Sequence, residues 1–161
     1  MSEHLQPHTE EDRLRLAAHR LLHELEEEPR DALISRFFVE EVPLDHVLLE
    51  ESHSNSRLFV ILKGSVSVKL PRDEHRVSEV KLATLGPGDM FGEYSLFDRH
   101  PVSATVYATE PTRVAWLEKA AMDEFFHEHG ESGRRFYEAI AKVLVARLRA
   151  KDAELDVVTI G

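Results

Sequence analysis

The sequence of 161 residues contains no cysteine, which excludes disulfide bonds, thiolate metal sites and thiol nucleophiles. It also lacks long apolar runs, since none approaches the roughly 20 residues that cross a bilayer. The polar start MSEHLQPHTEEDR has neither the charge nor the apolar stretch of a signal peptide. We therefore predict a cytoplasmic protein without membrane insertion.

Positive charge is scarce, because 20 Lys and Arg residues stand against 30 Asp and Glu residues, for a formal net charge of −10. This balance disfavours nonspecific affinity for nucleic acid and for anionic lipid. The apolar content of 42% is that of a globular protein, and the length suits one domain with its own core.

Groupings typical of enzymes are scarce as well. No P-loop and no Ser/His/Asp grouping can be recognised. A metal-binding β-roll would cluster histidines and a carboxylate on inward-facing strands, but the histidines of the strand-rich region are scattered singly. His19 and His23 lie one helical turn apart and could share a surface metal, although such a pair more often binds nothing. We predict a protein that is not an enzyme, with no catalytic residues and no metal site.

Residues 1–33 are predicted to form an N-terminal helical segment. Thr9 and Asp12 fit the start of a capping box. Apolar residues then recur at spacings of four, three and four along one helix, which Pro29 interrupts. This seam consists of Leu14, Ala18, Leu21 and Leu25. It is expected to pack against the domain, and the alternative is that it binds a partner.

Residues 36–119 have the pattern of an antiparallel β-roll or sandwich. Turn signals such as Gly86-Pro87-Gly88-Asp89 separate short β-rich segments, and no helical pattern lies between them. The segments are FFVEEV, HVLLEE, RLFVILKG, SVSVKLP, VSEVKLATL, VSATVYA and TRVAWLE. Seven or eight strands of this kind predict a mainly β fold with flanking helices.

The C-terminal part is predicted to be helical, with a first helix capped at Gly130 and a long helix from Ser132 to Leu155. The long helix carries two apolar stripes. The first is Phe136, Ile140 and Val143, and the second is Tyr137, Ala141, Leu144, Leu148 and Leu155. One stripe can pack on the β domain and the other on a second copy, so we predict a homodimer. The alternative is one broad face buried within a monomer. Five basic residues are interpreted as the solvated face of this helix: Arg134, Arg135, Arg147, Arg149 and Lys151.

Three landmarks accompany this order of elements: Gly64 after RLFVILK, LGPGD at residues 85–89, and FGEYSLFDRHPVSATV at residues 91–106. With them the chain resembles the cyclic nucleotide-binding domain of catabolite-activator-type regulators, cAMP-dependent kinase regulatory subunits and nucleotide-gated channels. The resemblance spans about residues 33–155 and implies an eight-stranded, cupin-like β-roll with helices at both ends. The expected division is an N-terminal helical segment (1–33), a cyclic nucleotide-binding-like domain that includes the C-terminal helix (34–155), and a tail (156–161).

Residues 91–106 are similar to the phosphate-binding cassette of that family, which implies roles for individual residues. Glu93, after Gly92, would accept a hydrogen bond from the ribose 2′-hydroxyl. A short helix at residues 94–97 would direct backbone N–H groups at the cyclic phosphate, as helix N-termini do. The implied ligand-binding residues are Gly92, Glu93, Tyr94, Ser95, Pro101, Val102, Ser103 and Ala104.

Val102 stands where ligand-responsive members of the family have an arginine. A hydrogen bond to a charged group contributes about 1.5–3 kcal/mol, and a buried anion without a counter-charge is costly. Glu93 adds a negative charge to the same cup. Arg99, in the loop before Pro101, is a possible substitute cation.

Three functions are compatible with this cassette: a weak cAMP or cGMP sensor, a pocket adapted to another ligand such as a cyclic dinucleotide, and an interaction module without a ligand. We favour a stand-alone regulatory or interaction module, impaired or ligand-independent for cAMP, that acts with an unknown protein partner. The alternative is a functional second-messenger sensor that transmits through its C-terminal helix. Transcription-factor relatives carry a helix-turn-helix after that helix, whereas this chain stops at Gly161, so we expect no DNA binding on its own.

Overall fold

The computed structural model describes residues 9–160, with side chains up to Leu155. The strands are β1 (Phe38–Val42), β2 (Val47–Leu49), β3 (Arg57–Lys63), β4 (Val66–Leu70), β5 (Val80–Leu85), β6 (Met90–Phe91), β7 (Thr105–Ala108) and β8 (Thr112–Glu118). The helices are α1 (Glu10–Ala18), α2 (Glu27–Ile34), α3 (Glu93–Asp98), α4 (Lys119–Glu128) and α5 (Gly130–Ile160).

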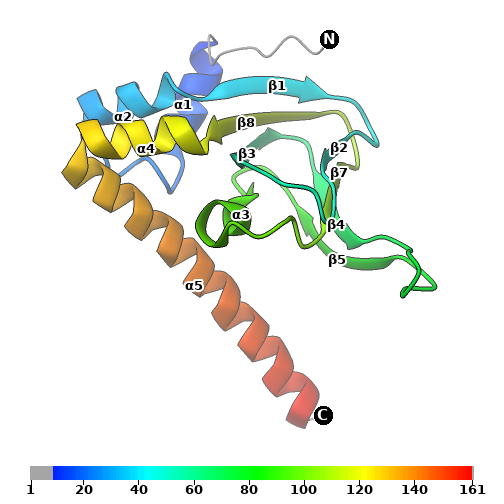
Figure 1. The fold of residues 1–161 in the computed structure, drawn as a ribbon. Helices are drawn as coiled ribbons and strands as arrows, with labels where there is room; N and C mark the ends of the chain where they lie inside the picture. The colour runs from blue at the N-terminus through cyan, green and yellow to red at the C-terminus, as the bar shows by residue number, and fades with distance from the viewer. Residues whose placement is uncertain (1–8, 161) are drawn as a thin grey trace.

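The strands form two four-stranded antiparallel sheets, in the orders β1-β8-β3-β6 and β2-β7-β4-β5. Helices α1, α2 and α4 gather at one end of the sheets, and α5 runs from that end past α3 and beyond the roll (Figure 1). The predicted eight-stranded β-roll, with helices before it and a long helix after it in the sequence, is therefore confirmed. Strand β6 is the one the sequence did not indicate, because two residues are too short to show an alternating pattern.

The core has two parts, and β3 separates them. Leu58, Val60 and Leu62 belong to the cluster between the β1-β8-β3-β6 sheet and the helices. Phe59 and Ile61 alternate with them and belong to the cluster inside the roll. Because side chains alternate across a strand and both faces of β3 are buried, this segment has the continuous apolar sequence LFVIL.

The predicted single N-terminal helix is wrong, because the segment forms two helices, α1 and α2. Thr9 caps α1 as expected, its side chain accepting a 3.0 Å hydrogen bond from the N–H of Asp12. The chain then leaves the helix at His19, and Leu21 and Leu25 are buried in the connecting turn instead of continuing a helical stripe. Leu14, at the start of the proposed seam, is 63% exposed. The leucines are buried by folding back onto the other helices, a tertiary effect that periodicity alone does not reveal.

Helix α5 begins earlier than predicted, because Gly130 is its first residue and the break after α4 falls at His129 alone. The first predicted stripe is confirmed, since Phe136, Ile140 and Val143 are all buried. The second stripe divides in two. Tyr137 and Leu144 pack partly against the domain, whereas Ala141, Leu148 and Leu155 are exposed.

A buried ion pair attaches α1 to the roll. Asp12 is only 3% exposed, and its two carboxylate oxygens accept hydrogen bonds from Nε and Nη2 of Arg113 on β8, at 2.8 and 2.6 Å. The same guanidinium also donates to the exposed Glu41 on β1, at 3.0 Å. One arginine thus has a buried and an exposed partner, which permits a matched comparison.

We predict that Asp12→Ala lowers the free energy of unfolding by about 2–3 kcal/mol, because Arg113 loses its buried partner. Glu41→Ala removes the exposed partner and should cost well under about 1 kcal/mol. Urea denaturation at pH 7 measures both. The hydrogen bond from Arg113 lowers the pKa of Asp12, so its stabilisation is complete above the ordinary pKa and fades as pH falls toward the lowered value. The deficit of Asp12→Ala should therefore shrink in acid, and equal losses in the two variants would contradict the assignment.

Candidate functional site

The cassette, residues 91–106, runs from the end of β6 through α3 and a loop into β7. Gly92 makes the turn into α3 with φ +87°, in the left-handed region that favours glycine. A Cβ at Gly92 would lie 2.5 Å from the carbonyl oxygen of Arg57. Nδ2 of Asn55 donates hydrogen bonds to the carbonyl oxygens of both residues, at 3.1 Å to Gly92 and 2.9 Å to Arg57. The turn is thus held against the loop before β3, and it directs the next residue inward.

Glu93, the first residue of α3, has a buried carboxylate held by an arginine of α5. Its Oε1 accepts a 2.6 Å hydrogen bond from Nη1 of Arg147, and Nη2 of Arg147 donates to the carbonyl oxygen of Met90. The other carboxylate oxygen, Oε2, is buried and has no hydrogen-bond partner among the residues that the structure describes. Burial raises the pKa of Glu93, and the backbone N–H of Glu93 and the positive charge of Arg147 oppose that rise. The cassette therefore holds a cation, but it comes from α5.

The sequence interpretation missed this role of Arg147, which it placed on the solvated face of the long helix. That interpretation is wrong for Arg147, whose side chain is 32% exposed and paired, whereas Arg149 and Lys151 are exposed. The spacing of Arg147 in the sequence does indicate the buried face of the helix. Arg147 follows Val143 by four residues and Ile140 by seven, so it extends the buried stripe of α5 by one helical turn.

Val102 lies at the position where the resemblance implies an arginine. Its side chain is buried in the apolar cluster inside the roll, together with Phe59, Phe91 and Trp116. Its backbone is paired with the loop before β3: its N–H donates to the carbonyl of His53 at 2.9 Å, and its carbonyl accepts from Ser52 at 2.8 Å. This position is therefore fixed and apolar.

The remaining predicted cassette residues fall into two groups. Ala104 is buried and Ser95 is half-buried, while Tyr94, Pro101 and Ser103 are exposed. Tyr94 is 59% exposed, so its ring does not fill the cup. Arg99, the predicted substitute cation, is exposed at the left-handed residue that ends α3. The helix itself spans Glu93–Asp98, one residue more at each end than predicted.

A second contact joins the cassette to α5. The ring of Phe97 on α3 lies 5.7 Å from the ring of Tyr137 on α5, measured between centroids. Tyr137 in turn lies 4.1 Å from Phe126 of α4. Helix α3 therefore touches α5 through an aromatic pair and through the Glu93–Arg147 ion pair, so a displacement of either helix must disturb both contacts.

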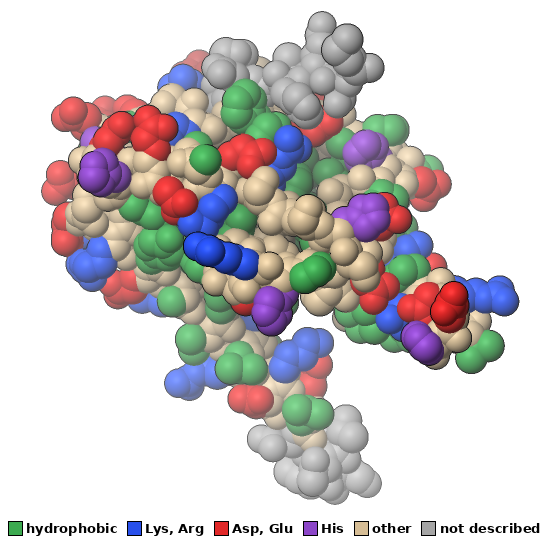
Figure 2. Space-filling view, in the orientation of Figure 1, with side chains coloured by type: hydrophobic (Ala, Val, Ile, Leu, Met, Phe, Trp, Pro, Cys, Tyr) green, Lys and Arg blue, Asp and Glu red, His purple; other side chains and the backbone are tan. Residues whose placement is uncertain are grey.

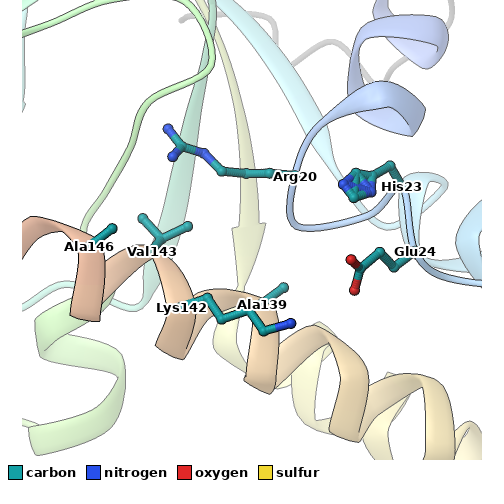
Figure 3. Close-up of a pocket in the computed structure, with 7 residues that line it drawn as sticks. All are labelled: Arg20, His23, Glu24, Ala139, Lys142, Val143 and Ala146. Carbon is teal, nitrogen blue, oxygen red and sulfur yellow. The ribbon is translucent and has the colours of Figure 1, made fainter.

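Outside the cassette, a shallow hollow of about 240 Å³ lies between the turn after α1 and α5 (Figure 3). It is lined by Arg20, His23, Glu24, Ala139, Lys142, Val143 and Ala146, none of which belongs to the cassette. Acidic and basic side chains are intermixed on the face shown in Figure 2, with no extended basic patch. Within residues 9–155 we find no group of three His, Asp or Glu side chains placed to hold a metal ion. Among the described helices, none has the length and apolar character needed to cross a membrane.

Comparison with known proteins gives a consistent result. Residues 39–129 match the family described as the cyclic nucleotide-binding domain. The chain is 31% identical over 142 residues to the cyclic AMP receptor protein of Thermus thermophilus, covering 86% of this chain and 62% of the relative. It is 28% identical over 113 residues to a CRP-like cAMP-activated global transcriptional regulator of Mycobacterium tuberculosis, covering 70% of this chain and 48% of the relative.

Among solved structures, a cyclic nucleotide-binding domain from Methylobacillus flagellatus superposes with a TM-score of 0.76 at 27% identity, covering 88% of this chain and 78% of that one. The chain spans about half the length of the Mycobacterium regulator and less than two thirds of the Thermus receptor. The matched relatives include regulators and also a protein named glutaminase 2 from Bradyrhizobium diazoefficiens, which is 34% identical over 63% of this chain and 15% of the relative. The part that matches the family, residues 39–129, contains the strands of the roll and the cassette.

We predict that Arg147→Ala lowers the free energy of unfolding by about 2–3 kcal/mol at pH 7, because the buried Glu93 carboxylate loses its counter-charge. Arg149→Ala, which removes an exposed arginine two residues away, should be nearly neutral. Without Arg147 the pKa of Glu93 should rise further, so protonation becomes easier as pH falls. The deficit of Arg147→Ala should therefore be smaller at pH 5 than at pH 7 in urea denaturation. A deficit that does not change with pH would contradict a charged pair at this place.

Proposed function

The chain belongs to the cyclic nucleotide-binding domain family, and we propose that it is a regulatory module whose cassette binds cAMP and cGMP weakly or not at all. The apolar burial of Val102 is the observation that carries this proposal. A phosphate placed in the cup would meet Val102 in place of a guanidinium, and the Glu93 carboxylate would share the same cup.

The free-energy cost of having valine in place of arginine at position 102 is large enough to lower the affinity for cAMP substantially. One hydrogen bond to a charged group is worth about 1.5–3 kcal/mol, or about 10- to 150-fold in affinity. Burying an anion near a carboxylate without a new counter-charge adds to that loss. Arg147 brings a cation to the cassette, but its guanidinium already contacts Glu93 and the carbonyl of Met90. A cAMP molecule would have to compete with contacts that hold α5 in place.

We propose that the module acts through α5 as a homodimer that contacts a further protein. Val145 and Leu148 on the projecting part of this helix are 50% and 63% exposed. Exposed apolar side chains along one helix are typical of helix–helix association. The net charge of −10 on these 161 residues disfavours binding of this segment to a phosphate backbone.

A functional sensor is the second candidate, favoured by one specific observation. Oε2 of Glu93 is a buried acceptor for which residues 9–155 supply no hydrogen-bond donor, and such an acceptor is costly. A ligand hydroxyl could donate to Oε2 while Oε1 keeps Arg147, as a ribose would. Such a ligand would strengthen the link between α3 and α5, and the helix would then report its binding.

We predict by titration calorimetry that wild type gives no heat with cAMP or cGMP at submillimolar concentration, whereas Val102→Arg gains at least about tenfold in cAMP affinity through the restored counter-charge. Val102→Met is the control, because it lengthens the side chain without a charge and should give no gain. Submillimolar binding to wild type that is lost in Glu93→Gln would replace this proposal with the sensor. An unchanged Val102→Arg would show that a missing charge is not what impairs the cup.

We predict by light scattering that wild type is a dimer and that Leu148→Glu is a monomer, because a charge placed in an apolar helix seam opposes association. Leu14→Glu is the matched control: this leucine is also 63% exposed but lies on α1. It should remain a dimer. A monomeric wild type, or equal dissociation in both variants, would exclude association through α5.

A further inference from the structure

His19 connects the turn after α1 with the turn that precedes the cassette. Its Nε2 lies 2.7 Å from the carbonyl oxygen of Gly88, between β5 and β6. Its Nδ1 lies 3.2 Å from the backbone nitrogen of Leu21. The side chain is nearly buried, with 9% of the residue exposed. Both ring nitrogens are therefore used, and they bridge segments that are 69 residues apart in the sequence.

The two partners fix the protonation state of this ring. A carbonyl oxygen can only accept, so Nε2 must carry the proton and donate it to Gly88. A backbone N–H can only donate, so Nδ1 must be the unprotonated acceptor for Leu21. The geometry thus requires neutral imidazole. Protonation would place a second N–H at Nδ1, facing the N–H of Leu21, and would leave that buried donor without its acceptor.

The turn held by His19 also covers α5. Leu21, Leu22 and Leu25 in this turn belong to the same buried cluster as Ile140 and Val143 of α5. Figure 3 shows Arg20, His23 and Glu24 of the turn facing Ala139, Lys142, Val143 and Ala146 of the helix. On its other side, the turn holds Gly88, which lies two residues before Met90, where Arg147 docks.

We propose that His19 is an acid-labile latch: its protonation releases the turn of residues 19–26 from the roll and weakens the packing of that turn against α5. This regulation is separate from the proposed function, because it does not depend on whether the cassette binds a nucleotide. It would make the arrangement of α5 respond to mild acidity.

The surroundings of His19 favour the neutral ring over the protonated one. Burial is the largest effect and lowers the pKa of His19, and the nearby Arg20 and His23 act in the same sense. The Gly88 carbonyl and Asp89, on the facing turn, oppose it. Glu24 and, on α5, Lys142 are the other charged side chains that line the adjoining hollow. Since the folded state disfavours the charged ring, the latch is fully effective above the ordinary histidine pKa of 6.5 and weakens as pH falls below it.

Hydrogen exchange of the full chain at pH 7.5 and pH 5.5, expressed as protection factors corrected for the intrinsic exchange rate, tests the latch. At pH 5.5, one pH unit below the ordinary histidine pKa, protection should be up to about tenfold lower than at pH 7.5 for the amides of Leu21, Leu22, His23 and Leu25. Amides of β3 should keep their protection, which separates local release from global unfolding.

Two variants distinguish the latch from other acid effects. His19→Asn cannot be protonated and keeps an acceptor for Leu21, so its protection in this turn should be lower at pH 7.5 but should not change with pH. His23→Asn removes the exposed histidine of the same turn and should retain the pH dependence of wild type. Persistence of the acid loss in His19→Asn, or its absence in wild type, would overturn the proposal.

A measurement on wild type guards against a variant that fails to fold. Imidazole ¹⁵N spectra should show His19 as the Nε2–H tautomer, titrating below 6.5. The opposite tautomer, or titration at or above 6.5, would exclude the latch.

Discussion

The ion pair between Glu93 and Arg147 is the contact through which the cassette and α5 hold each other. Glu93 is the first residue of α3, and the turn at Gly92 forces its carboxylate inward, where burial makes an isolated charge costly. The cation that offsets this cost lies on a helix 54 residues later in the sequence. Because the same guanidinium also reaches the Met90 carbonyl, α5 is fixed at the start of β6 and the start of α3 together.

The Glu93–Arg147 ion pair bears directly on the absence of an arginine at position 102. The cup lacks a cation at Val102, but Arg147 brings one from α5, and its charge is used to neutralise the protein's own carboxylate. An anionic ligand that drew its counter-charge from Arg147 would therefore take it from the contact that positions α5. For this reason the proposed insensitivity to cAMP and the proposed signalling through α5 have one physical origin. Signalling through α5 does not require that cAMP binding be completely absent. A ligand that used Oε2 of Glu93 would act on the same contact without breaking it.

Much of the fold could be predicted from the sequence, and the exceptions have physical reasons. The β-roll follows from short alternating or continuous apolar segments such as RLFVILK, and the buried stripe of α5 from the spacing of Phe136, Ile140 and Val143. The split into α1 and α2 could not be foreseen, because Leu21 and Leu25 satisfy a helical period and are nevertheless buried in a turn by contacts with distant helices. Arg147 was misjudged because its charge suggested solvent, although its spacing from Val143 indicated the buried face. The location of the cassette followed from its sequence, but the partner of Glu93 could not, since that pairing depends on the docking angle of α5.

Two polar bridges, one made by Arg147 and one by His19, hold α5 in place. Arg147 fixes the helix from the cassette side through a charge pair, and His19 fixes the turn that covers the helix from the other side through a neutral ring. The first contact contains a buried carboxylate oxygen that has no hydrogen-bond partner among the described residues, so a donor that reached this oxygen would act on the contact. The second is sensitive to protons, because only neutral imidazole satisfies both of its partners. Since both bridges end on the short stretch from Gly88 to Glu93, that stretch links the cup, the N-terminal turn and α5, and a change at either bridge alters the support of the same helix.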